Sequence, residues 1–330
     1  MKSEQEFKEF VSANLFSVFS PLQAMRLKVL ARILSIIIIL VTGVLLSFLS
    51  FLLLRTAVIL FIVGGISLVA SLLVYILYVK DAYDAYKIAY KAKLISGIIR
   101  FVNPSLSYNP SGGIAQNKYM MSGIYTTIPD RYNSEDLIYG FLGKTQIEFS
   151  EVHSEYKTET TDKDGHKREQ WHTIFKGIFI VADFNKEFKG KTVVLPDFAE
   201  KFFGFIGQTL QSWNLTRGQL IKLEDPEFER LFVVYGSDQV EARYILSPAL
   251  MSRMVEFNAK AKKLCGGDLS FSFVGSKLFI AIPCSKALFE PTIFRSVNDL
   301  RTLIDYFSFI NLSAGVVEEL ELNTRIWTKS

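Results

Sequence analysis

The sequence predicts an α+β protein in which an N-terminal transmembrane hairpin of two helices precedes a mostly antiparallel β-sheet domain with packed helices. Three observations predict this class. Residues 33–54 and 56–79 form two apolar runs without a charged side chain, separated only by Arg55. The remainder combines short apolar strands with capped helices, and it lacks the regular strand–helix alternation of a doubly wound sheet. Finally, the 28 phenylalanines are spread over both parts, so the second part can build its own core.

Each apolar run is long enough to cross a hydrocarbon layer about 30 Å thick as a helix. We therefore expect a transmembrane hairpin over residues 29–80. Gly43, Ser47 and Ser50 share one face of the first run, and small faces let two helices approach closely in lipid. Gly64, Ser67 and Ser71 repeat this spacing in the second run.

The hairpin is flanked by helical segments. Residues 1–28 are expected to form an amphipathic segment, because Phe7, Phe10 and Val11 fall on one helix face. Ser20 followed by Pro21 favours a new helix start within this segment. Residues 81–103 are expected to continue as a juxtamembrane helix, since tyrosines recur there at helical spacing.

Basic residues set the expected orientation. Arg26, Lys28 and Arg32 precede the hairpin, a group of lysines follows it from Lys80, and only Arg55 marks the turn. The positive-inside rule then places both termini of this two-pass protein in the cytoplasm and the turn outside. The formal net charge of +4 is concentrated near the membrane, which favours anionic lipid headgroups and excludes a nucleic-acid partner.

Residues 104–330 are expected to form the cytoplasmic α+β domain. Lys144–Val152 and Trp171–Asp183 read as strands joined by a long exposed loop over residues 155–170. Further strands are expected at Lys191–Leu195, Arg230–Tyr235, Ala242–Leu246, Ser270–Val274 and Lys277–Ile282. Helices are expected after the capping residues Asp197, Ser247 and Ser296 with Asp299. The acidic run from Glu224 to Glu229 reads as an exposed turn.

Two cysteines flank one expected hairpin. Cys265 precedes and Cys284 follows the segment Leu269–Pro283, which turns at Gly275-Ser276, so the two thiols are expected to lie close in space. In a cytoplasmic domain we expect both to be reduced. No histidine is near them in sequence, which disfavours a zinc site there.

All three histidines lie in one short region. If the hairpin turns near Asp162 and Lys163, His153 and His172 face each other across two strands, where cross-strand side chains come close enough to share a metal. His166 or Glu151 could complete such a site. The plainer interpretation is a polar hairpin surface. We therefore assign no catalytic, cofactor-binding or metal residue, and keep His153 and His172 as metal candidates.

Several stretches resemble one bacterial family. These are Trp171–Gly177 with the strand after it, Leu223–Glu229, Asp238–Tyr244 and Leu288-Phe289-Glu290-Pro291. Together they resemble the family DUF3137, uncharacterised membrane proteins that are sometimes labelled galanin, over roughly residues 75–320. The resemblance implies a membrane-anchored bacterial protein and no established catalytic residues. It also implies a LemA-like membrane protein as a possible partner.

Two functions remain open. The first is a non-enzymatic adaptor that binds a protein partner, another copy of itself or lipid headgroups at the inner membrane. The second is a membrane-tethered enzyme, metal-dependent through the His153/His172 region. No nucleophile elbow, His-Glu-x-x-His or dinucleotide fingerprint occurs in the sequence, and no cofactor is expected. This absence favours the adaptor.

The sequence makes one further structural prediction. Gly177 lies within an expected strand, which predicts a bulge or a close backbone approach at this position.

Overall fold

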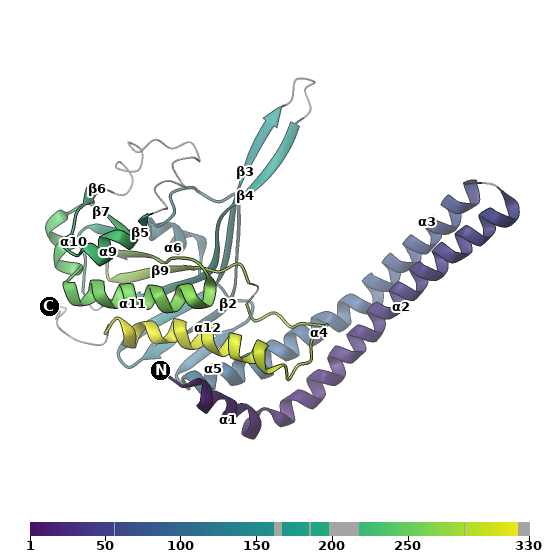
Figure 1. The fold of residues 1–330 in the computed structure, drawn as a ribbon, viewed down its shortest axis with the longest axis horizontal. Helices are drawn as coiled ribbons and strands as arrows, with labels where there is room; N and C mark the ends of the chain where they lie inside the picture. Colours follow the sequence, from purple (N-terminus) through teal and green to yellow (C-terminus); the bar gives the residue numbers. More distant parts are fainter. Residues whose placement is uncertain (56, 162–166, 185, 198–217, 287, 323–330) are drawn as a thin grey trace. The chain divides into compact units, whose positions relative to one another are not determined.

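The computed structural model describes residues 1–330 except 56, 162–166, 185, 198–217, 287 and 323–330 (Figure 1). The chain divides into two compact units. We call Glu4–Ile98 together with Phe289–Ile304 the helical unit. The sheet unit consists of Met1–Ser3, Ile99–Leu288 and Asp305–Ser330.

The helical unit contains the two apolar runs as long helices. Its helices are α1 (Glu4–Asn14), α2 (Phe16–Leu54), α3 (Ala57–Val74) and α4 (Lys80–Tyr90), with π-helical turns at Tyr75–Val79 and Lys91–Ile95 before α5 (Ser96–Val102). The fresh start expected at Ser20-Pro21 is wrong. Helix α2 begins at Phe16, so Pro21 lies inside its second turn, where it cannot donate the usual i→i−4 backbone hydrogen bond.

Two helical segments, Phe16–Leu53 and Leu60–Val102, are long and apolar enough to cross a membrane. Only 11% and 6% of their most apolar windows are buried within the protein, which is unlike the core helix of a soluble domain. Large apolar side chains point outward instead; Leu53 is 74% exposed and Phe61 77%. Because continuous apolar surface of this extent is stable only when covered, these helices fit a lipid environment.

Small residues form the seam between α2 and α3. A Cβ atom placed on Gly43 would lie 2.1 Å from Ser67 Oγ, so only glycine allows this approach. Ser47 and Ser71 are buried in the same seam, and the Ser67 hydroxyl donates a hydrogen bond to the Ile39 carbonyl at 3.2 Å. The expected small faces are therefore real packing surfaces, with backbones brought close where the side chains are small.

The sheet unit is built on one antiparallel sheet of nine strands in the described residues, in the order β1-β2-β3-β4-β9-β8-β5-β7-β6. The strands are β1 (Leu106–Asn109), β2 (Arg131–Leu142), β3 (Thr145–Thr161), β4 (Lys167–Asp183), β5 (Lys191–Pro196), β6 (Gln219–Ile221), β7 (Phe232–Gly236), β8 (Ser270–Val274) and β9 (Lys277–Pro283). The helices are α6 (Gln116–Met121), α9 (Pro226–Leu231), α10 (Gln239–Ile245) and α11 (Pro248–Cys265), with α12 (Leu300–Glu319) shared between the units. This α+β architecture confirms the predicted fold class.

Both faces of the sheet are covered. On one face, Tyr119 of α6 packs among Val152, Phe179 and Phe279 in an aromatic-rich core. Side chains alternate along a strand, so Ile178, Ile180 and their neighbours in β9 point to the other face, along which α11 lies in Figure 1. Helix α11 begins as predicted, with the Ser247 hydroxyl accepting from the Leu250 amide at 3.3 Å.

Two local predictions in the sheet unit are wrong. The loop expected over residues 155–170 is mostly strand, since β3 and β4 stay paired as far as Thr161 and Lys167. The polar residues in this stretch are typical of a loop, but here they are the side chains of an exposed two-stranded ribbon. Figure 1 shows this ribbon projecting from the sheet. The strand expected at Ala242–Leu246 is α10 instead, because Asp238 caps the amides of Val240 and Glu241 at 2.8 and 3.0 Å.

The acidic run is likewise a helix start. The Asp225 carboxylate accepts from the amides of Glu227 and Phe228, both at 3.0 Å, and Pro226 occupies the first turn of α9. Strand β7 therefore begins at Phe232 rather than Arg230. The helix expected after Asp197 lies outside the described residues.

Candidate binding site: a cavity beside an open strand edge

Strand β4 lies between β3, which is equally long, and β9, which is much shorter. It pairs with β3 along its whole length, but with β9 only from Gly177 onward. Among the described residues, the outer edge of β4 over residues 167–175 has no strand partner. The last bond on that side joins the Lys176 carbonyl to the Cys284 amide at 2.9 Å. The sheet therefore has a corner where backbone groups of β4 face open space.

Gly177 allows the two strands to meet at this corner. Its φ is +154°, and a Cβ atom there would lie 2.0 Å from the Ile282 carbonyl oxygen. The close backbone approach predicted from the sequence is confirmed, and the irregularity in the ladder lies nearby, between Ser154 and Glu155.

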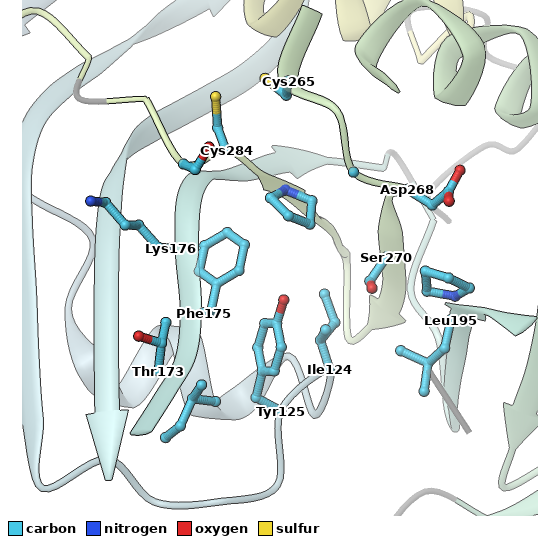
Figure 2. A pocket seen from close by; sticks show the side chains of 15 residues that line it. Ile124, Tyr125, Thr173, Phe175, Lys176, Leu195, Cys265, Asp268, Ser270 and Cys284 are labelled. Atoms are coloured by element: carbon cyan, nitrogen blue, oxygen red, sulfur yellow. The ribbon is translucent and has the colours of Figure 1, made fainter. Parts of the chain in front are cut away.

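A cavity of about 500 Å³ occupies the corner. Its walls come from the open edge of β4, the ends of β5, β8 and β9, and the turn that follows α11. Figure 2 shows Ile124, Tyr125 and Phe175 at its centre, with Lys176 and Asp268 toward opposite sides. A largely apolar hollow with a few polar groups around it is the usual form of a small ligand or peptide side-chain site.

Asp268, an acidic residue in the cavity wall, already has hydrogen-bond partners within the protein. Asp268 accepts hydrogen bonds from the Asn258 amide at 2.9 Å and from the Lys262 ammonium at 2.8 Å. Asn258 in turn accepts from the Leu269 amide at 2.8 Å. These contacts tie α11 to the start of β8 and stabilise the turn, so Asp268 has a structural role in shaping the cavity.

The two thiols meet at the rim of this cavity. Cys265 is the last residue of α11, and Gly266 after it forms an isolated antiparallel bridge with Cys284. The two side chains are hydrogen-bonded to each other, and both cysteines are free. The proximity predicted from the hairpin is confirmed. The cavity itself has no sequence signal, because its walls come from segments far apart in the chain.

The histidines do not form the expected pair. His153 lies opposite Lys176, whereas His172 lies opposite Tyr156, so the assumed register is wrong. The pairing of Thr161 with Lys167 sets a register different from the assumed one, and the irregularity at Ser154 shifts the pairing by one more residue. His172 stacks on Tyr156 and its Nε2 is 2.9 Å from the Thr158 hydroxyl. His166 lies outside the described residues.

One carboxyl group of the sheet unit has an unusual environment. Burial raises the pKa of Glu151 to about 7, and the nearby carboxylates of Asp136 and Glu135 add to the effect. The Leu288 amide, which donates to Glu151 at 3.2 Å, and Lys176 act in the opposite direction. Glu151 therefore changes charge near neutral pH.

This environment predicts a pH-dependent stability. Because the folded-state pKa of Glu151 lies above its ordinary value of 4.5, its contribution is fully present below pH 4.5 and is lost as the pH rises through 7. The wild type should therefore lose about 2 kcal/mol more stability than Glu151→Gln between pH 5 and pH 8. Thermal unfolding of the purified chain in detergent measures this difference. Glu256→Gln, on an exposed position of α11, controls for general charge effects and should follow the wild type.

Comparison with known proteins agrees with the resemblance. Residues 173–322 match the family described as protein of unknown function DUF3137, which confirms the prediction for this part of the chain. No curated protein matches the sequence. Among solved structures, the crystal structure of the mycobacterial trehalose monomycolate transport factor A, TtfA, matches with 12% identity and a TM-score of 0.31. That match covers 66% of this chain and 96% of the other.

Proposed function

We propose that this protein is a membrane-anchored adaptor of the bacterial inner membrane. Its hairpin crosses the bilayer twice over residues 33–54 and 56–79, and its sheet domain, residues 104–330, works in the cytoplasm. The observation that supports the anchor most strongly is the outward-facing apolar surface of two adjacent helices. Since neither span contains a charged side chain, the hairpin is poorly suited to an ion or substrate path, and the working part is the sheet domain.

The orientation rests on the basic flanks. Arg26, Lys28 and Arg32 lie before the hairpin and Lys80 after it, while Arg55 is at the turn. Basic residues are retained on the cytoplasmic side during insertion, so both termini belong there.

The sheet domain binds a partner protein through an extended segment of that partner. The open edge of β4 offers unpaired backbone donors and acceptors, and the apolar cavity beside it can receive a side chain of the added strand. Strand addition uses this combination, in which backbone bonds give affinity and a side-chain pocket gives specificity. A LemA-like membrane protein is the first candidate, because the family resemblance implies it.

Reporter fusions test the anchor. A fusion after Ser330 should behave as cytoplasmic, and a fusion inserted at Arg55 should behave as external. The opposite pattern would contradict the proposed orientation, whatever the partner is.

Site-specific photo-crosslinking tests the binding mode. A photoreactive residue at Ile174, on the cavity wall, should crosslink the LemA-like protein when the two are co-expressed. The same probe at Tyr139, exposed on β2, should not. Adding Leu195→Trp fills the cavity and should abolish the Ile174 product. Equal crosslinking from both positions, or no effect of the cavity-filling variant, would reject strand addition at this edge.

A further inference from the structure

The rim of the cavity holds the only two cysteines of the chain. Helix α11 ends at Cys265 because Gly266, with φ +87°, takes the left-handed conformation that caps the helix. The bridge between Gly266 and Cys284 then holds the end of β9 beside the helix end. Backbone structure on both sides therefore fixes the two sulfur atoms next to each other, as Figure 2 shows.

The two thiols differ in their acidity. The hydrogen bond that Cys265 donates is the main cause that lowers the pKa of Cys284 to about 7, and the backbone amide and the positive charge of Lys286 act in the same direction. Burial and the Asp305 carboxylate oppose them. Donation of the same hydrogen bond, with burial, raises the pKa of Cys265. With the shared hydrogen bond donated by Cys265, Cys284 is the more acidic of the two thiols.

The cavity gives a reagent access to Cys284. Cys284 is buried, with only 2% of its surface exposed in total, and it lies in the wall of the 500 Å³ hollow together with Phe175 and Pro283. Cys265 is partly exposed at the same wall. An apolar or aromatic group of modest size can therefore occupy the hollow while its sulfur approaches Cys284.

We propose that Cys265 and Cys284 form a reactive dithiol site that exchanges with small disulfides carrying an apolar or aromatic group. The Cys284 thiolate attacks one sulfur of the disulfide RS–SR, forms a mixed disulfide and releases one thiolate RS⁻. Cys265 then loses its proton and attacks Cys284 Sγ, which releases the second RS⁻ and closes the Cys265–Cys284 disulfide. In total, the two protein thiols are oxidised and one RS–SR is reduced to two RSH.

A chromogenic aromatic disulfide, whose released nitrobenzoate thiolate absorbs visible light, tests this chemistry on the full chain in detergent. The wild type should release two equivalents per chain and retain no reagent by intact mass, because the second thiol resolves the mixed disulfide. Cys265→Ser should release one equivalent and retain the other half of the reagent. Wild-type protein that carries two reagent groups would show two independent thiols and overturn the proposal.

The rate identifies the nucleophile. A pKa near 7 instead of 9 raises the thiolate fraction at pH 7 about 50-fold. The less basic thiolate is also a weaker nucleophile, which lowers the rate constant of the thiolate about tenfold. Cys265→Ser replaces the thiol that donates to Cys284 with a hydroxyl, which changes the pKa of Cys284. The comparison therefore uses the wild type, whose first step should be about fivefold faster than that of a simple thiol of pKa 9. The rate should reach half its plateau near pH 7; a midpoint near 9 would contradict an activated Cys284.

A variant that keeps both thiols separates access from folding. Leu195→Trp narrows the cavity at the wall opposite the sulfur pair (Figure 2) and leaves Cys265 and Cys284 in place. It should slow the aromatic disulfide at least about tenfold but leave alkylation by iodoacetamide, a much smaller reagent, within about twofold. Equal slowing of both reagents would point to a general structural change, and no slowing would show that the disulfide does not enter through the cavity. Either result would overturn the assigned role of the cavity.

Discussion

Replacing Glu290 with leucine should destabilise the helical unit by about 3 kcal/mol or more. The Glu290 carboxylate lies 2.8 Å from the ammonium groups of both Lys87 and Lys91. The Lys91 side chain is only 2% exposed, and the nearby carboxylate helps to offset the loss of its hydration. Leucine would leave the buried positive charge without the carboxylate that both lysines face.

Thermal unfolding of the purified chain in detergent should show a midpoint lowered by roughly 5–10 °C for Glu290→Leu. Glu4→Leu is the matched control, because Glu4 pairs with Lys8 on an exposed helix face and such pairs contribute little. The double variant Lys91→Met with Glu290→Leu should recover most of the loss, since it replaces the pair by apolar groups. Equal midpoints for the Glu290 and Glu4 variants would show that burial of Lys91 carries no cost.

The same segment contacts the helices at further points. Arg26, on α2, donates to the Ile293 carbonyl at 2.6 Å, and the Gln23 side chain accepts from the Val297 amide at 3.2 Å. The motif Leu288-Phe289-Glu290-Pro291 thus leads into a stretch that binds α2 and α4 within the helical unit. Sequence motifs marked this stretch, but they could not identify its contacts, since about 200 residues separate Glu290 from the two lysines.

Features set by local chemistry could be predicted from the sequence. Uncharged apolar runs identify the hairpin, small residues identify its seam, and the Ser247-Pro248 pair identifies the start of α11. The β8–β9 hairpin could be predicted in the same way, because glycine favours tight turns. Gly275 indeed takes a positive φ of 60° at this turn. In each case one type of local structure satisfies both the backbone and the apolar pattern.

Features set by tertiary context could not be predicted. The charged residues of the β3–β4 ribbon have loop-like composition, and their strand structure comes from pairing with each other across the hairpin. Residues 238–244 alternate like an edge strand, but the Asp238 cap and the burial of Ala242 and Ile245 one turn apart favour a helix. The cavity needs the relative positions of β4, β5, β9 and α11, which no single segment encodes.

Gly177→Ala should be strongly destabilising, by about 3 kcal/mol or more. The added methyl group would overlap the Ile282 carbonyl at 2.0 Å and the Cys284 amide at 2.7 Å, and both are backbone groups in or beside β9. The φ of +154° is also a conformation that alanine rarely takes. Relief would therefore require β4 and β9 to separate at the centre of the sheet, where Ile178 and Ile282 are both buried.

The matched control is Gly275→Ala. Gly275 also has a positive φ, of 60°, but no atom lies within 4 Å of the added Cβ, so only the backbone cost of about 1 kcal/mol applies. Urea unfolding in detergent should place the Gly177 variant well below the Gly275 variant in midpoint. Similar midpoints would mean that β4 and β9 can separate at Gly177 without a loss of stability. Because separation would also lengthen the bond from the Cys284 amide to the Lys176 carbonyl, the Gly177 variant should expose Cys284 to iodoacetamide more than the Gly275 variant does.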